Sequence, residues 1–125
     1  MLIHVTDADF PVDMISGVPV LRAPEDVDVS NADGLRAALV HAAGLRALPS
    51  TVVVDMARTE FCDTAGLHAL VAAHKRARAE GGQLLLVIGG AAVLRVFSIT
   101  GLDRIIPHVT SLEDALARVG VAEAG

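Results

Sequence analysis

The stretch 51–82, TVVVDMARTEFCDTAGLHALVAAHKRARAEGG, decides the fold of this chain. It opens with β-branched residues on successive positions, which favours a strand buried on both faces, because a half-solvated strand alternates apolar with polar residues. Asp63 can cap a helix whose first turn is 64–66, and the apolar residues that follow recur at helical spacing. The polar turn 60–66 therefore lies between the carboxyl end of a strand and the amino end of a helix, where open α/β sheets place functional groups.

Length and composition indicate a single soluble domain. The 125 residues suffice to bury a core without metal or disulfides, and we expect one domain over 1–125 with its core at about 11–119. No apolar run reaches the ~18–20 residues of a membrane span, and no signal peptide is visible, so the cytoplasm is the expected location and no membrane partner is expected. A net charge of −5, no Trp or Tyr and only three Phe argue against nucleic acid as a direct partner.

Turn and stop signals divide the rest of the chain into short elements. Two strands on either side of Ser16 and Gly17 form a hairpin, and glycines end the helices. An acidic connector, 24–28, precedes the first helix, for which Asp28 or Ser30 is the expected cap. The expected elements are, in order, strand 11–15, strand 18–23, helix 31–43, strand 51–55, a helix from 64 to the glycines at 81 and 82, strand 83–88, helix 91–99, strand 104–109 and a helix from a cap at 111 to about 119, with a frayed tail from 120. This order predicts an α/β fold: a mixed sheet with an opening hairpin, parallel interior strands and about four helices.

Motifs of common catalytic scaffolds are absent from the sequence. It lacks Gly-x-x-x-x-Gly-Lys, Gly-x-Gly-x-x-Gly, His-Glu-x-x-His and Gly-x-Ser-x-Gly, so we expect no enzyme activity and no cofactor. His68 and His74 are six residues apart, on different helix faces, and are expected to be surface or boundary residues rather than ligands of one metal. The lone Cys62 cannot form an internal disulfide, and the neighbouring Asp63 would raise its pKa, so we expect a partly buried, unreactive thiol.

Two features leave ligand binding open. Several carboxylates could meet at one end of the sheet and hold a divalent cation: Asp26, Asp28, Asp55, Glu60 and Asp63. Capping and solvated loop charge are the simpler explanation, and we assign no metal site. Gly89 and Gly90 separate a strand from a helix, where backbone N–H groups could hold a phosphate, although a tight turn also explains them.

Thr64 has a more specific setting. It directly follows the capping Asp63, which places its hydroxyl in the first turn of a helix, where free N–H groups and the helix dipole can receive a phosphate. A modification at Thr64 is therefore physically feasible. On these grounds alone, a role in starting the helix explains the hydroxyl as well.

Segment 53–67, VVDMARTEFCDTAGL, resembles the signature of bacterial anti-sigma factor antagonists, in the STAS domain family. In that family a strand ending in Asp is followed by Asp-Ser-Ser/Thr-Gly-Leu at a helix start. The similarity extends to 26–28 with the helix after it, to 82–87 and to 94–102, and it covers roughly 11–119. The resemblance implies the STAS-like form of the mixed sheet expected above.

The resemblance also implies a partner-switching function. The unmodified antagonist binds an anti-sigma factor, usually also a serine-protein kinase, and frees a sigma factor; phosphorylation reverses this binding, and a phosphatase is expected to restore it. The family's phosphoacceptor is the hydroxyl residue right after the Asp, a role that carries onto Thr64. The family usually has Ser at that position, a second hydroxyl residue where this chain has Ala65, and Gly where it has Glu25.

We expect the partner to bind at one end of the sheet. If the turn 63–67 and the acidic connector lie together, they make an acidic rim around small apolar residues, suited to a basic patch on a partner. The predicted partner-binding residues are Asp26, Asp28, Asp63, Thr64, Ala65, Gly66 and Leu67. A STAS interaction module without phosphorylation, and a phosphate- or nucleotide-binding module, remain the alternatives.

Overall fold

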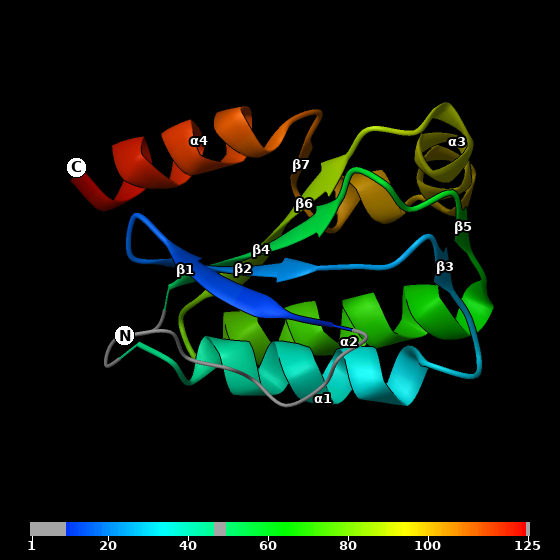
Figure 1. Cartoon of the computed structure of the whole chain (residues 1–125), viewed down its shortest axis with the longest axis horizontal. Helices are drawn as coiled ribbons and strands as arrows, with labels where there is room; N and C mark the ends of the chain where they lie inside the picture. Colours follow the sequence, from blue (N-terminus) through cyan, green and yellow to red (C-terminus); the bar gives the residue numbers. More distant parts are fainter. Residues whose placement is uncertain (1–9, 47–49, 125) are drawn as a thin grey trace.

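The computed structural model describes residues 10–46 and 50–124 and shows a sheet between two layers of helices (Figure 1). Helices α1 (Ala32–Ala43) and α2 (Thr64–Ala79) cover one face, and α4 (Leu112–Ala124) lies on the other. Helix α3 (Ala91–Thr100) lies at one end of the molecule. These helices agree with the expected α/β fold.

The main sheet is mixed, as predicted. Its strand order is β1-β2-β4-β6-β7. The bounds are Val12–Ile15 for β1, Val18–Arg22 for β2, Thr51–Met56 for β4, Gln83–Ile88 for β6 and His108–Val109 for β7. The pair β1 and β2 is antiparallel, and the other neighbours are parallel. The opening hairpin turns at Ser16 and Gly17, which both have positive φ.

Successive residues of the central strand serve two different cores. Val52 and Val54 belong to the core that includes α1 and α2, whereas Val53 packs in the core that includes α4. Because both faces of β4 are covered, an unbroken apolar run is what this strand requires. The interpretation of 51–55 as a buried central strand is confirmed.

Two short strands occupy segments that were expected to be loops. Strand β3 (Asp26–Val27) lies within the acidic connector and pairs in parallel with β5 (Phe61–Cys62). The expectation of plain loops is therefore wrong at both places. A two-residue strand is too short to show a period in its sequence, and its pairing depends on a partner far along the chain.

Three further local predictions are wrong in their details. The last strand, expected over 104–109, is present but shorter: β7 covers only His108–Val109, and a 3-10 turn, Leu102–Arg104, precedes it. The N-cap of α1 is Asn31, which makes no side-chain cap bond, and the side chains of Asp28 and Ser30 bond to each other instead. Helix α4 continues to Ala124 instead of ending near 119.

No helix within residues 10–46 and 50–124 has the length and apolar character needed to cross a membrane.

Candidate functional site

The ladder of β3 and β5 joins the acidic connector to the turn that precedes α2. Asp26 lies opposite Phe61, and Val27 lies opposite Cys62. One residue further on, the Asp63 N–H donates to the Val27 carbonyl at 3.0 Å. The two predicted partner-binding segments are thus neighbours, held together by backbone hydrogen bonds.

The carboxylate of Asp63 fixes the start of α2. Its Oδ1 accepts a hydrogen bond from the Gly66 N–H at 3.0 Å, which is the N-cap arrangement predicted from the sequence. Its Oδ2 accepts from the Val29 N–H at 3.2 Å, in the loop between β3 and α1. One side chain therefore both caps the helix and ties the two segments together.

Thr64 is the first residue of α2, and its side chain is exposed. Within the described part of the chain, its backbone N–H and that of Ala65 have no hydrogen-bond acceptor. An exposed hydroxyl beside free N–H groups, at the positive end of a helix dipole, is a place where a phosphate is tolerated electrostatically.

Helix α2 approaches the β3–β5 ladder closely at Gly66. A Cβ atom on this residue would lie 2.7 Å from Cγ1 of Val27 and 2.8 Å from Sγ of Cys62. Both neighbours are buried and have little room to move. The glycine that follows Thr64 by two positions therefore sets how closely the helix packs on the ladder.

The predicted partner-binding residues differ in how far they reach the surface. Asp26 and Thr64 are exposed; Asp28, Asp63 and Ala65 are half-buried; Gly66 and Leu67 are buried. Gly66 and Leu67 therefore support the site from beneath, and they offer a partner little surface.

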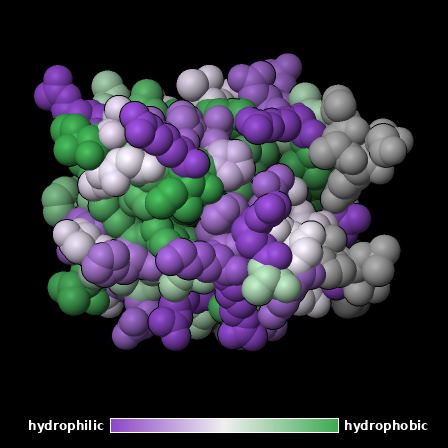
Figure 2. All heavy atoms as spheres, turned by 180° about the vertical axis from the view of Figure 1, so that it is seen from behind, coloured by the Kyte–Doolittle hydropathy of each residue, from purple (hydrophilic) through white to green (hydrophobic). Residues whose placement is uncertain are grey.

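Sequence reasoning missed two exposed apolar side chains at this site. Val29 follows β3 and is 79% exposed, and Phe61 in β5 is 51% exposed. Viewed from behind, the molecule shows apolar residues gathered toward the end that carries β5 and α3 (Figure 2). The position of Val29 inside the polar run 28–31 was a usable signal of exposure, whereas Phe61 reads as an ordinary strand residue.

Asp28 organises the loop between β3 and α1. Its carboxylate accepts hydrogen bonds from the hydroxyl and the N–H of Ser30, and these bonds lower the pKa of Asp28. Asn31 accepts the Asp28 N–H at 2.9 Å and donates its side-chain amide to the Asp26 carbonyl at 2.9 Å. The rim of the site therefore carries a fixed negative charge at neutral pH.

The alternative ligand sites have a mixed outcome. The part of the chain that the structure describes holds no group of three or more His, Cys, Asp or Glu placed to bind a metal. Asp55, proposed in that group, instead accepts the Ala57 N–H at 3.0 Å. Gly89 and Gly90 line an open hollow of 480 Å³ at the start of α3, together with Arg58 and the two acidic residues Glu25 and Glu60.

Cys62 is a buried thiol with a raised pKa. It is 5% exposed, and burial, followed by the charge of Asp63, raises the pKa of Cys62 to about 12. The thiolate is therefore scarce at neutral pH, as expected from the sequence, although the residue is buried more fully than predicted.

The two histidines of α2 have different surroundings. His68 is exposed, in agreement with its predicted surface position. His74 is only 6% exposed, so the same expectation is wrong for it. Its Nδ1 accepts the Leu84 N–H at 3.2 Å and so links α2 to β6. Burial, and secondarily the charge of Arg78, lowers the pKa of His74.

Known proteins share this architecture. A match to the STAS domain family spans residues 9–115. An anti-sigma factor antagonist from Mycobacterium paratuberculosis is 29% identical, with a TM-score of 0.77 over 92% of this chain and 98% of that chain. The anti-sigma factor antagonist SpoIIAA in its unphosphorylated form is 23% identical, with a TM-score of 0.72 over 88% of this chain and 95% of that chain. The Bacillus cell fate determinant SpoIIAA in its phosphorylated form is 22% identical, with a TM-score of 0.66 over 88% of this chain and 98% of that chain.

The same fold also occurs in a different setting. A sulfate transporter family protein from Wolinella succinogenes is 19% identical, with a TM-score of 0.77 over 90% of this chain and 92% of that chain. Identities this low show the shared fold alone. The family match runs from before the hairpin into the first turns of α4, and the chain therefore belongs to the STAS domain family.

Proposed function

We propose that the chain is an anti-sigma factor antagonist that works by partner switching. Without phosphate, its acidic end binds an anti-sigma factor, often a serine-protein kinase, and a sigma factor is released. Phosphate on Thr64 ends this binding, and a phosphatase restores it. The observation that carries the proposal is the exposed Thr64 at the start of α2, directly after the capping Asp63.

The expected effect of the phosphate on the fold is small, because two local effects oppose each other. A phosphate adds about −1.5 to −2 charges. The amino end of α2 stabilises such a charge by roughly 0.3–1 kcal/mol, while Asp63 and Glu60 oppose it by a similar amount. The side chain of Thr64 is exposed, so no core contact is lost when it is modified.

The effect on an interface is expected to be large. A phosphate dianion buried at an interface that had accommodated a neutral hydroxyl must lose its hydration. This costs on the order of several kcal/mol unless the partner places a cation opposite it. Since each 1.4 kcal/mol or so is a factor of about ten in affinity, binding should fall by orders of magnitude. Binding and folding should therefore respond differently to the same modification.

The test uses the serine-protein kinases of the anti-sigma class from the source cell, each purified and incubated with this chain and ATP. We expect phosphopeptide mass spectrometry to find the phosphate on Thr64. Thr64→Ala should bind the same kinase but stay bound after ATP is added, and Thr64→Glu should bind more weakly. Thr110→Glu, at another exposed threonine, is the matched control and should bind normally. Phosphate on another residue, or tight binding by the phosphorylated protein, contradicts the proposal.

The acidic rim supports a basic partner. Asp28→Lys should weaken the complex and flatten its dependence on salt, because the carboxylate of Asp28 lies at the solvent-exposed rim, in the loop that Asp63 holds through the Val29 N–H. The affinity is measured by calorimetry at low and high salt. Unchanged affinity at low salt would place the partner on another face.

We further propose that the domain is a cytoplasmic binding module without catalysis of its own. Burial raises the pKa of the Cys62 thiol to about 12, which disfavours a thiolate nucleophile, and the described residues hold no group of three or more His, Cys, Asp or Glu placed to bind a metal. Turnover of ATP or GTP by the pure protein, lost on substitution of one surface acid, would overturn this part.

A second candidate function keeps the fold and dispenses with phosphorylation. The likeness to a sulfate transporter family protein supports it, because that protein has the same fold and is not named as an anti-sigma factor antagonist. In that case the kinases leave Thr64 unmodified, and Thr64→Glu has no effect on partner binding. Nucleotide binding at Gly89 and Gly90 is checked separately, by titrating ATP and GTP while thermal stability is followed.

A further inference from the structure

A groove runs between α1 and α2 and begins one residue after Thr64. It encloses 360 Å³. Its α2 side consists of three alanines, Ala65, Ala69 and Ala72, together with His68, while Val29 and, from α1, Ala32, Asp33 and Arg36 line the opposite wall. Small side chains on one wall leave room that larger ones would fill. The groove is therefore a place where a bulky side chain from outside can be received.

Val29 lines the groove at the end near Thr64, and its apolar side chain is exposed to solvent. It is 79% exposed, yet its backbone is fixed, because its N–H donates to the carboxylate of Asp63. The same carboxylate caps α2, so Val29 is held at a set position relative to the helix that carries Thr64. A fixed apolar residue loses little conformational entropy when a partner covers it.

The charges around the groove are mostly negative. Among the lining residues, Asp33 stands against Arg36, and His68 lies on the α2 wall. The carboxylate of Asp63, which accepts the Val29 N–H, and that of Asp28, which precedes Val29, add two negative charges at the end near Thr64. A partner segment that inserts an apolar side chain into the groove should therefore bind most tightly if the residues next to that side chain are lysine or arginine. Burial of one such side chain, at the centre of a polar rim, is the arrangement typical of an interface hot spot.

We propose that the partner that binds at Thr64 inserts an apolar side chain, flanked by basic residues, into this groove. The inference rests on the proposed function for the identity of the partner, but the occupant's chemistry follows from the groove. The binding face would thus extend from Thr64 along the seam of α1 and α2. It would reach residues that the family signature in 53–67 does not include.

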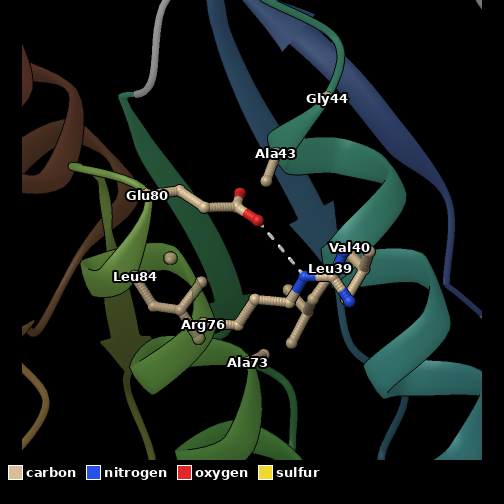
Figure 3. Close-up of a pocket in the computed structure, with 9 residues that line it drawn as sticks. Leu39, Val40, Ala43, Gly44, Ala73, Arg76, Glu80 and Leu84 are labelled. Carbon is tan, nitrogen blue, oxygen red and sulfur yellow. Dashed lines mark ion pairs between the residues drawn. The ribbon is translucent and has the colours of Figure 1, made fainter.

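The same seam offers a matched control at its other end. There, Val40 and Ala43 of α1 face Ala73 and Leu84 around a smaller hollow of 190 Å³ (Figure 3). Arg76 and Glu80 lie across this hollow, paired at 3.4 Å (Figure 3). The two hollows share the same helices, but only the groove adjoins the turn of Thr64.

The experiment compares Ala72→Trp, which fills the groove, with Val40→Trp, which fills the far hollow. Both variants are first checked for folding by circular dichroism and urea unfolding. Affinity is then measured for the anti-sigma kinase that binds the unmodified protein. Ala72→Trp should weaken binding by about tenfold or more, and Val40→Trp by less than about twofold. Equal effects, or no effect of the folded Ala72→Trp variant, overturn the proposal.

A second measurement separates this inference from the proposed function. The peptide acetyl-Lys-Arg-Leu-Lys-Arg-amide is titrated into the labelled protein and followed by NMR. We expect the amide signals of Ala65, Ala69 and Ala72 to shift, and replacement of the peptide's Leu by Ser to abolish the shift. If no anti-sigma factor binds but the peptide does, the proposed function fails and the groove stands. Shifts elsewhere, or concentration-dependent self-association that Ala72→Trp abolishes, would show a different occupant and overturn it.

Discussion

Replacement of Gly66 by alanine tests whether α2 is seated on the β3–β5 ladder as closely as the structure shows. The added Cβ would lie 2.7 Å from Cγ1 of Val27, 2.8 Å from Sγ of Cys62 and 3.2 Å from the Val27 carbonyl oxygen. All three atoms belong to residues with at most 5% exposure. The helix or the ladder must therefore shift to admit one methyl group.

The size of the effect follows from two opposing contributions. Alanine is favoured over glycine inside a helix by about 1 kcal/mol. Overpacking a closed site costs about 1–3 kcal/mol. Gly66→Ala should therefore lower the free energy of unfolding by up to about 2 kcal/mol, instead of raising it as propensity alone would do.

Gly120→Ala is the matched control, because Gly120 lies inside α4 and an added Cβ meets nothing within 4 Å. This variant should raise the free energy of unfolding by up to about 1 kcal/mol. Urea unfolding at one pH measures both variants, and their difference should be about 1–3 kcal/mol, the cost of overpacking alone. If both variants stabilise the protein equally, the close approach of α2 to the ladder is wrong.

Three further predictions use the same urea assay or a simple chemical probe. Asp63→Ala should lower the free energy of unfolding by about 1 kcal/mol and Asp63→Asn by less, because an amide oxygen still caps α2; equal losses would contradict the cap. Since burial, then Arg78, lowers the pKa of His74, the unfolded state binds more protons, so stability should fall as the pH drops below about 6.5. In His74→Asn, whose side-chain oxygen can accept the Leu84 N–H, the free energy of unfolding should depend less steeply on pH. If the pH dependence is unchanged, groups other than His74 cause it. Cys62, with a pKa of about 12, should react with iodoacetamide at pH ~8 far more slowly in the native than in the urea-unfolded protein, as followed by mass spectrometry.

The features that the sequence predicted correctly are those set by short-range rules. The N-cap of α2 needs only an acceptor three residues before a donor, so Asp63 and its bond to Gly66 could be read from the chain. The buried strand 51–55 was predictable because successive β-branched residues suit a strand covered on both faces. The end of α3 at Gly101 was predictable because glycine readily adopts the positive φ that ends a helix, and Gly101 does so in the structure.

The features that it missed depend on contacts between distant segments. The pairing of β3 with β5 joins residues 35 positions apart, and each strand is too short to carry a period. His74 follows Leu70 by four positions, so helical spacing places it on the buried face of α2, but the hydrogen bond that satisfies it there depends on the Leu84 N–H of β6. For α1, the capping preference of Asp gave a wrong prediction. The Asp28 carboxylate accepts hydrogen bonds from the N–H and the hydroxyl of Ser30 instead of capping the helix.

Neighbouring residues of the first turn of α2 differ in whether they face the core or the solvent, and this difference matters for the proposed switch. Gly66 and Leu67 face inward and seat the helix, while Thr64 faces water. Asp63 connects the two roles, because its two oxygens hold the helix start and the Val29 loop at once. In the proposed switch, a charge added at Thr64 would change the surface that a partner meets, while the contacts that position this surface remain in place. We therefore expect the modification to alter binding strongly and the stability of the fold little.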